Sequence, residues 1–198
     1  VEFYRRGNNF QTALKSVEQF LDQSSKTMQP VAMVRKGQIL LDLDRVTEAE
    51  AAFRQVIKEF PTSAALFQAQ HLLGVCRLEQ DDPQGAADQW KALLSTDRLT
   101  PQAVEWRDAL FSLARLHTES AAWSRRQLER PEVSDTETER LWADVANKAS
   151  EAAKLLYEFV SRYPQASDVA EARYHLGKSL QLLGDCRYRE WQAAETEN

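Results

Sequence analysis

The chain has 198 residues, of which 43% are hydrophobic and 28% charged, as in a globular protein with its own core. Its formal net charge of -5 argues against a broad nucleic-acid-binding surface, because such surfaces are built from clustered Lys and Arg. No apolar run approaches the roughly 20 residues that a membrane-spanning helix needs. We therefore expect neither a nucleic-acid partner nor membrane insertion by this segment.

One stretch of the sequence is repeated later in the chain. Residues 48–82 align without a gap on residues 151–185, and the alignment pairs Gly74 with Gly177. Each copy has the pattern of an amphipathic helix, a proline that ends it, and a second amphipathic helix with a Leu-Gly pair. The apolar residues follow helical spacing throughout, and we find no convincing strand-like alternation. The pattern predicts an all-α protein built from helix pairs.

Weaker copies of the same unit share a small residue followed four positions later by a large one. These pairs are Ala13 with Val17, Ala49 with Phe53, Ala86 with Trp90, and Ala152 with Leu156. A small side chain lets a neighbouring helix approach, and the large one fills the space beside it. Glycine inside a helix costs about 1 kcal/mol relative to alanine, so Gly37, Gly74 and Gly177 indicate close packing of a second helix.

Four predicted helix starts carry residues that are typical of helix caps. Two are capping boxes, in which a hydroxyl residue precedes a glutamate by three positions, and two place the cap directly before a first-turn proline. The predicted caps are Thr47, Asp82, Thr100 and Ser134.

The step from Ala86 to Ala152 is nearly twice the usual spacing, and no further Pro-Gly unit lies between them. We therefore expect one stretched hairpin, with helices over residues 101–129 and 135–163. Its predicted seam consists of Trp123, Leu128, Leu141, Trp142 and Val145. Two interpretations of the hairpin remain open, a structural insertion and a docking arm.

The run Ala49-x3-Phe53-x7-Pro61 resembles the tetratricopeptide repeat motif, and the stretch from Phe60 to Ala69 resembles its longer bacterial variant. That variant has units of 36–37 residues and is frequent in cell-envelope proteins. The resemblance implies a right-handed α-α superhelix, a tetratricopeptide-like solenoid, here with one extended helical hairpin. It leaves the compartment open between the bacterial cell envelope, the periplasm and the cytoplasm.

We expect residues 1–198 to form a single solenoid domain that is a fragment of a longer protein. The expected units cover about 1–29, 30–61, 62–100, 101–163 and 164–198. The last unit is expected to turn after Asp185 into a second helix that contains Trp191.

No catalytic or metal-binding motif is recognisable. The glycines do not cluster into a phosphate-binding loop, and the spacing of His71, His117 and His175 is not that of helical metal ligands. Cys76 and Cys186 lie far apart and match no ligand spacing. We expect no enzymatic activity, no cofactor and no metal.

In helix-pair solenoids the first helix of each pair lines the concave surface, which commonly binds partners. We expect the side chains three positions before and one after each closely packed small residue to line this groove. These are Val34, Gln38, His71, Val75, Phe111, Arg115, Tyr174 and Lys178. Such a groove suits a protein or peptide segment with apolar anchors and a carboxylate near Arg115 or Lys178. The alternative is that these residues only contact neighbouring helices, or that a terminal helix fills the groove.

Two kinds of function fit this sequence. The first is a non-catalytic scaffold that binds a protein segment in the groove. The second is a structural or self-associating segment of a larger assembly, or an adaptor domain attached to an enzyme.

Overall fold

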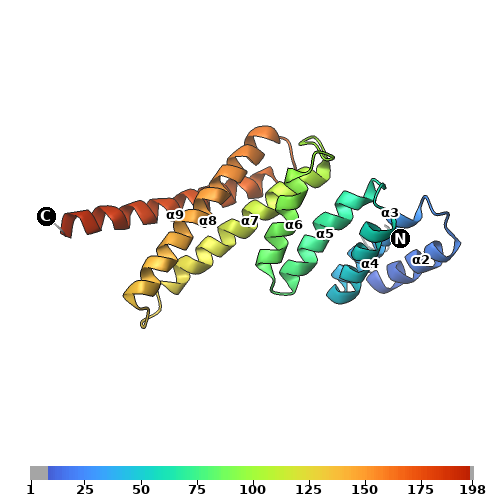
Figure 1. The fold of residues 1–198 in the computed structure, drawn as a ribbon, viewed down its shortest axis with the longest axis horizontal. Coiled ribbons are helices and arrows are strands. Elements are labelled where there is room, and N and C mark those ends of the chain that lie inside the picture. The colour runs from blue at the N-terminus through green and yellow to red at the C-terminus, as the bar shows by residue number, and fades with distance from the viewer. Residues whose placement is uncertain (1–8, 197–198) are drawn as a thin grey trace. The chain divides into compact units, whose positions relative to one another are not determined.

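The computed structural model describes residues 9–196, and over this range every regular element is an α-helix (Figure 1). The helices are α2 (Phe10–Gln23), α3 (Gln29–Asp42), α4 (Val46–Glu59), α5 (Ala65–Glu79), α6 (Pro83–Ser95), α7 (Val104–Gln127), α8 (Asp135–Arg162) and α9 (Val169–Thr196). The all-α fold with paired helices is confirmed. The described chain forms two compact units that divide between Ala109 and Leu110, within α7.

The N-terminal unit is a series of helices in which each packs on the next, from α2 to α6 (Figure 1). Two of its turns have the same geometry. Asp44 and Asp81 have φ near +60°, and the N–H of the residue after each donates to a carbonyl five positions back, Leu40 or Arg77. This bonding pattern ends a helix on a left-handed residue and turns the chain directly into the following helix.

The glycines of α3 and α5 allow close packing within these hairpins, as the sequence predicts. A methyl group at Gly37 would overlap the ring of Phe53, and one at Gly74 would overlap the indole of Trp90. Both aromatic side chains are fully buried, and the Trp90 Nε1–H donates to the carbonyl oxygen of His71 at 3.1 Å. The second helix of each pair therefore packs its large side chain directly on the glycine of the first.

The extended hairpin is confirmed, and most of α7 and all of α8 lie in the C-terminal unit. Helix α8 has 28 residues, against 14 in α4, and it begins at the predicted cap, where Ser134 Oγ accepts from the Glu137 N–H. The apolar seam includes Leu141 and Val145, both buried. Trp123 was wrongly placed there, because its side chain is 55% exposed; Ala121 and Ala122 face the seam instead.

Polar contacts also join the helices of this unit. Lys148 Nζ donates to Ser120 Oγ at 3.0 Å, and the hydroxyls of Thr118 and Ser179 are hydrogen-bonded at 3.0 Å in a fully buried position. Arg189 pairs with Glu139. These contacts fix α7 and α9 against each other and α8 against both.

Helix α9 continues where the repeat pattern predicts a turn, so that prediction is wrong. The alignment pairs Asp81, the left-handed residue after α5, with Gly184, but Gly184 lies inside α9 and has a negative φ. The helix runs unbroken from Val169 to Thr196 and includes Trp191. The helical hydrogen bonds continue through Gly184, since adding a residue to an existing helix is more favourable than starting a new one.

Candidate functional site

Four of the predicted groove residues lie in the N-terminal unit, and one of them is not accessible. Val34 is 1% exposed and belongs to the core, so its assignment to a binding surface is corrected. Gln38 is half-buried and its Oε1 accepts from Arg35 Nη1 at 3.0 Å. His71 and Val75 are half-buried on α5. A partner could reach only parts of the last three side chains.

His71 is involved in helix packing rather than in an open site. Its ring lies 6.1 Å from the Trp90 ring, and its carbonyl accepts the Trp90 indole N–H. Burial lowers the pKa of His71, and the charge of Asp108 opposes that shift. The imidazole is therefore expected to be neutral at pH 7.

The other four predicted residues lie on α7 and α9 in the C-terminal unit, where they surround His175. Tyr174 is 65% exposed and its ring meets that of His175 edge-on at 5.3 Å. Arg115 Nη1 lies 3.7 Å from Glu171 Oε1, and Lys178 is half-buried nearby. The structure thus gathers Arg115, Tyr174 and Lys178 on one surface, which we call the α7–α9 surface.

Phe111 supports this surface from below instead of lining it. Its side chain is only 8% exposed and packs on Phe159 with ring centroids 5.2 Å apart. It also meets the His175 ring edge-on at 6.3 Å. The alternative interpretation, contact with neighbouring helices, therefore holds for Phe111 as it does for Val34.

His175 is the buried polar group of the α7–α9 surface. Burial lowers its pKa; the carboxylates of Glu119 and Glu171 oppose the shift, and the cations Arg115 and Lys178 reinforce it. Its Nδ1 is buried without a hydrogen-bond partner among the described residues. A neutral imidazole beside two cations makes this surface suited to apolar groups and to carboxylates.

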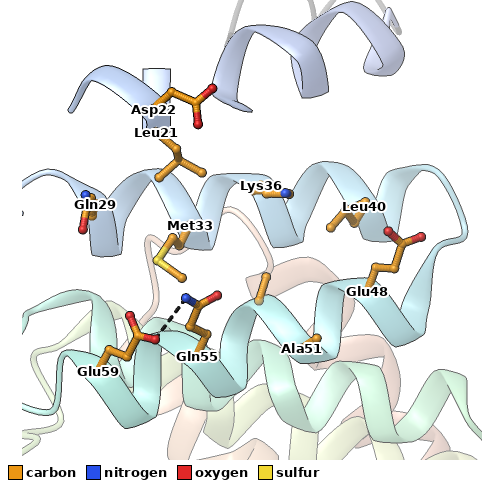
Figure 2. A pocket seen from close by; sticks show the side chains of 11 residues that line it. Leu21, Asp22, Gln29, Met33, Lys36, Leu40, Glu48, Ala51, Gln55 and Glu59 are labelled. Carbon is orange, nitrogen blue, oxygen red and sulfur yellow. Dashed lines mark hydrogen bonds between the residues drawn. The ribbon is translucent and has the colours of Figure 1, made fainter. Parts of the chain in front are cut away.

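A second feature, which the sequence reasoning missed, is a hollow of about 450 Å³ between α2, α3 and α4. Leu21, Met33 and Leu40 form its apolar part, and Figure 2 shows polar side chains around it, with Gln55 Nε2 donating to Glu59 Oε1 at 3.1 Å. Its volume falls within the range of small-ligand sites. The small side chains Ala51 and Ala52 on α4 leave it open.

The charges around this hollow are already paired in part. Lys36 Nζ lies 2.9 Å from Glu18 Oε1, and Glu48 accepts two hydrogen bonds of 2.7 Å from Arg45. The hydrogen bonds from Arg45 hold the pKa of Glu48 below its usual value. The remaining rim carboxylates are Asp22 and Glu59, which give the hollow an acidic edge.

Reactive groups are sparse in the described part of the chain. No three His, Cys, Asp or Glu side chains there are arranged to hold a metal ion. Both cysteines are buried, and burial raises the pKa of Cys76 to about 12, so its thiol is not an available nucleophile. Among residues 9–196 no helix is long and apolar enough to cross a membrane.

Comparison with known proteins identifies the repeat. The family described as tetratricopeptide repeat matches residues 2–64. Two crystal structures of MamA superpose with TM-scores of 0.51 and 0.50, at 13% and 12% sequence identity. The first match covers 100% of this chain and 91% of that chain, and the second covers 97% and 95%. At these identities they show a shared fold.

A tetratricopeptide repeat protein from Parabacteroides merdae is also similar, with a TM-score of 0.48 and 12% identity over 93% of this chain and 73% of that one. No curated protein sequence matches the chain.

Proposed function

We propose that this chain is a non-catalytic scaffold that binds a protein or peptide segment at the α7–α9 surface, because the tetratricopeptide repeat family matches residues 2–64 and the helical fold is that of such a repeat protein. Tetratricopeptide repeats are in general protein-interaction scaffolds. The observation that carries the finer proposal is the exposure of Tyr174 beside the buried His175, which also lies close to the cations Arg115 and Lys178. An exposed tyrosine beside cations is a frequent anchor in protein interfaces.

The chemistry of the surface defines the expected ligand. Tyr174 offers an apolar ring that loses little conformational freedom on binding. Among the described residues, Arg115 forms two long ion pairs, 3.9 Å to Glu119 and 3.7 Å to Glu171, so a ligand carboxylate can compete for it. We therefore expect a segment with an apolar side chain next to an acidic one.

A paired set of variants tests this proposal. Tyr174→Ala with Lys178→Glu removes the exposed anchor and reverses the charge of the half-buried Lys178. The expected result is that cross-linked partners from a lysate of the source organism fall by about tenfold or more. The matched control is Tyr157→Ala with Lys154→Glu, an exposed Tyr-Lys pair on α8. It should retain the partners. Equal capture by both variants and the wild type would refute the proposed site.

The molecular mass in solution distinguishes self-association from binding of another protein. Light scattering over a concentration series is expected to show one constant mass for the purified chain. A mass that doubles with concentration, and returns to the monomer value in the Tyr174 and Lys178 variant, would assign the α7–α9 surface to self-association and contradict the proposal.

A further inference from the structure

The two aligned copies of the repeat differ in what covers their glycines. In α5, Gly74 is buried under Trp90, and in α3, Gly37 is buried under Phe53. In α9, Gly177 occupies the position of Gly74, but it is exposed, and a methyl group there would meet nothing within 4 Å. Gly184 is also exposed, and a methyl group there would likewise meet nothing within 4 Å. The glycine face of α9 thus has the small residues of a helix-packing face, but no helix among residues 9–196 covers it.

Large apolar side chains surround these glycines on the exposed side of α9. Leu180, Tyr188 and Trp191 are each more than half exposed, and the rings of Tyr188 and Trp191 stack with centroids 5.7 Å apart. Together with Gly177 and Gly184 they follow helical spacing along one face. We call this the open face of α9. Exposed apolar side chains gathered on one helix are typical of an interaction surface.

The last residues of α9 do not provide the large side chain that would pack on Gly177. Phe53 and Trp90 both follow their glycines by 16 residues, whereas the residue 16 positions after Gly177 is Ala193. The preceding small residue of the pattern, Ala49 or Ala86, is replaced by Arg189. The last part of α9 therefore lacks the side chains of a covering helix.

The charges beside the open face indicate what kind of helix fits. Arg173 and Arg187 are exposed on this side of α9 and take part in none of the ion pairs among the described residues. The nearby carboxylate of Asp185 already pairs with Arg125 at 3.3 Å. A second copy of α9 would bring further arginines to this face, whereas a helix with carboxylates at its edges would be attracted.

We propose that the open face of α9 binds an amphipathic helix of another protein, which presents a large aromatic side chain to Gly177 and carboxylates to Arg173 and Arg187. Helices α4 and α6 of this chain illustrate the required pattern, a small residue followed four positions later by Phe53 or Trp90. In α5, the His71 carbonyl accepts the Trp90 indole N–H. The aligned residue of α9 is Tyr174, so a tryptophan of the partner helix would donate its indole N–H to the Tyr174 carbonyl.

The chain itself supplies a probe for this interaction. A synthetic peptide of residues 82–96 contains α6, its Asp82 cap, Trp90 and a net charge of -1 from two aspartates and one lysine. Added to the isotopically labelled chain at up to about 1 mM, it is expected to shift the amide resonances around Gly177 and Gly184 in a saturable manner. A peptide with Trp90→Ala should bind about 30-fold more weakly.

Two chain variants complete the test. A Cβ atom at Gly177 would meet nothing within 4 Å, so Gly177→Leu should fold normally, and its side chain should occupy the open position and abolish the peptide-induced shifts. Ser150→Leu, an exposed position in the middle of α8, is the matched control and should bind as the wild type does.

The proposal is overturned if no shifts occur around Gly177 at the highest peptide concentration, or if the Trp90→Ala peptide or the Gly177→Leu chain binds equally well. It is also overturned if these resonances change with protein concentration alone while the mass doubles, since the face then binds a second copy. The readout is confined to the amides of α9 and needs no natural partner. Its failure would leave the proposed function of the α7–α9 surface standing.

Discussion

Helices α5 and α9 share an aligned sequence pattern but end in different surroundings. The inward faces agree, since Cys76 of α5 and the aligned Ser179 of α9 are both fully buried. The opposite faces differ, because Gly74 is covered by Trp90 whereas Gly177 is open. A repeat pattern thus defines which face of a helix can receive a neighbour, and the neighbour itself must be identified separately.

The continuation of α9 is part of the same difference. Helix α5 ends at Glu79, and Asp81 turns the chain into α6, which covers Gly74. At the aligned point α9 continues as a helix and carries Tyr188 and Trp191 outward instead. The open face is therefore longer than the covered face of α5, and it has its own aromatic residues.

The largest expected effect is a loss of stability when the side chain that covers Gly74 is removed. Trp90→Ala removes a fully buried side chain that fills the space above Gly74, and we expect a loss of about 3–5 kcal/mol in the free energy of unfolding. Trp191→Ala, at a side chain that is 53% exposed, should change it by less than about 0.5 kcal/mol. Urea unfolding measures both. Equal losses would contradict the assignment of Trp191 to an open face.

A smaller effect concerns His71 and His175, the two histidines whose pKa is lowered by burial. Burial lowers the pKa of His71 and of His175, so the unfolded chain binds protons more readily than the folded chain just below the ordinary histidine pKa of 6.5. Stability should therefore decrease as the pH falls from about 7.5 to about 5.5. His71→Gln and His175→Gln should each flatten this dependence, as measured by unfolding at a series of pH values. An unchanged slope in both variants would refute the neutral buried state.

The smallest effect compares the two thiols. Burial raises the pKa of Cys76 and of Cys186, so both should react slowly with a thiol reagent in the folded chain. Cys186 lies on α9, which lacks a covering helix on one side, and we expect it to be labelled faster than Cys76 because local opening there is easier. Mass spectrometry of the labelled chain gives both rates. Faster labelling of Cys76 would contradict this order.

Much of the fold was predictable because its signals are local. The small-large pairs and the glycines of α3 and α5 predicted close packing of helix on helix, because a small residue and a large one alternate across a close helix pair. The structure shows which side chains are involved, Phe53 on Gly37 and Trp90 on Gly74. The caps Asp82 and Ser134 were also correct, and each accepts a hydrogen bond from the N–H three residues later.

The two other predicted caps were wrong for a physical reason. Helix α4 begins at Val46, so Thr47 lies inside it, because the left-handed turn at Asp44 already directs the chain into the helix. Helix α7 begins at Val104, beyond Thr100 and its following proline. A cap motif indicates a possible start, but the preceding turn decides which residue is used.

The site was less predictable than the fold. A fixed offset from the packed small residue selected Tyr174 and Lys178, which reach the surface, but also Val34 and Phe111, which are buried. Side chains at equivalent helical positions differ in exposure because the neighbouring elements differ, and those contacts are distant in sequence. The openness of Gly177 was missed for the same reason, since its local sequence is that of a covered glycine.

The central claim, that the glycine face of α9 is open whereas that of α5 is covered, is tested most directly by two alanine substitutions measured side by side. Gly74→Ala forces a methyl group into the Trp90 indole, and we expect a net loss of about 1–3 kcal/mol in the free energy of unfolding. Gly177→Ala meets no neighbour and should gain up to about 1 kcal/mol from its higher helix propensity. Opposite signs support the account, and a loss of similar size at both positions would contradict it.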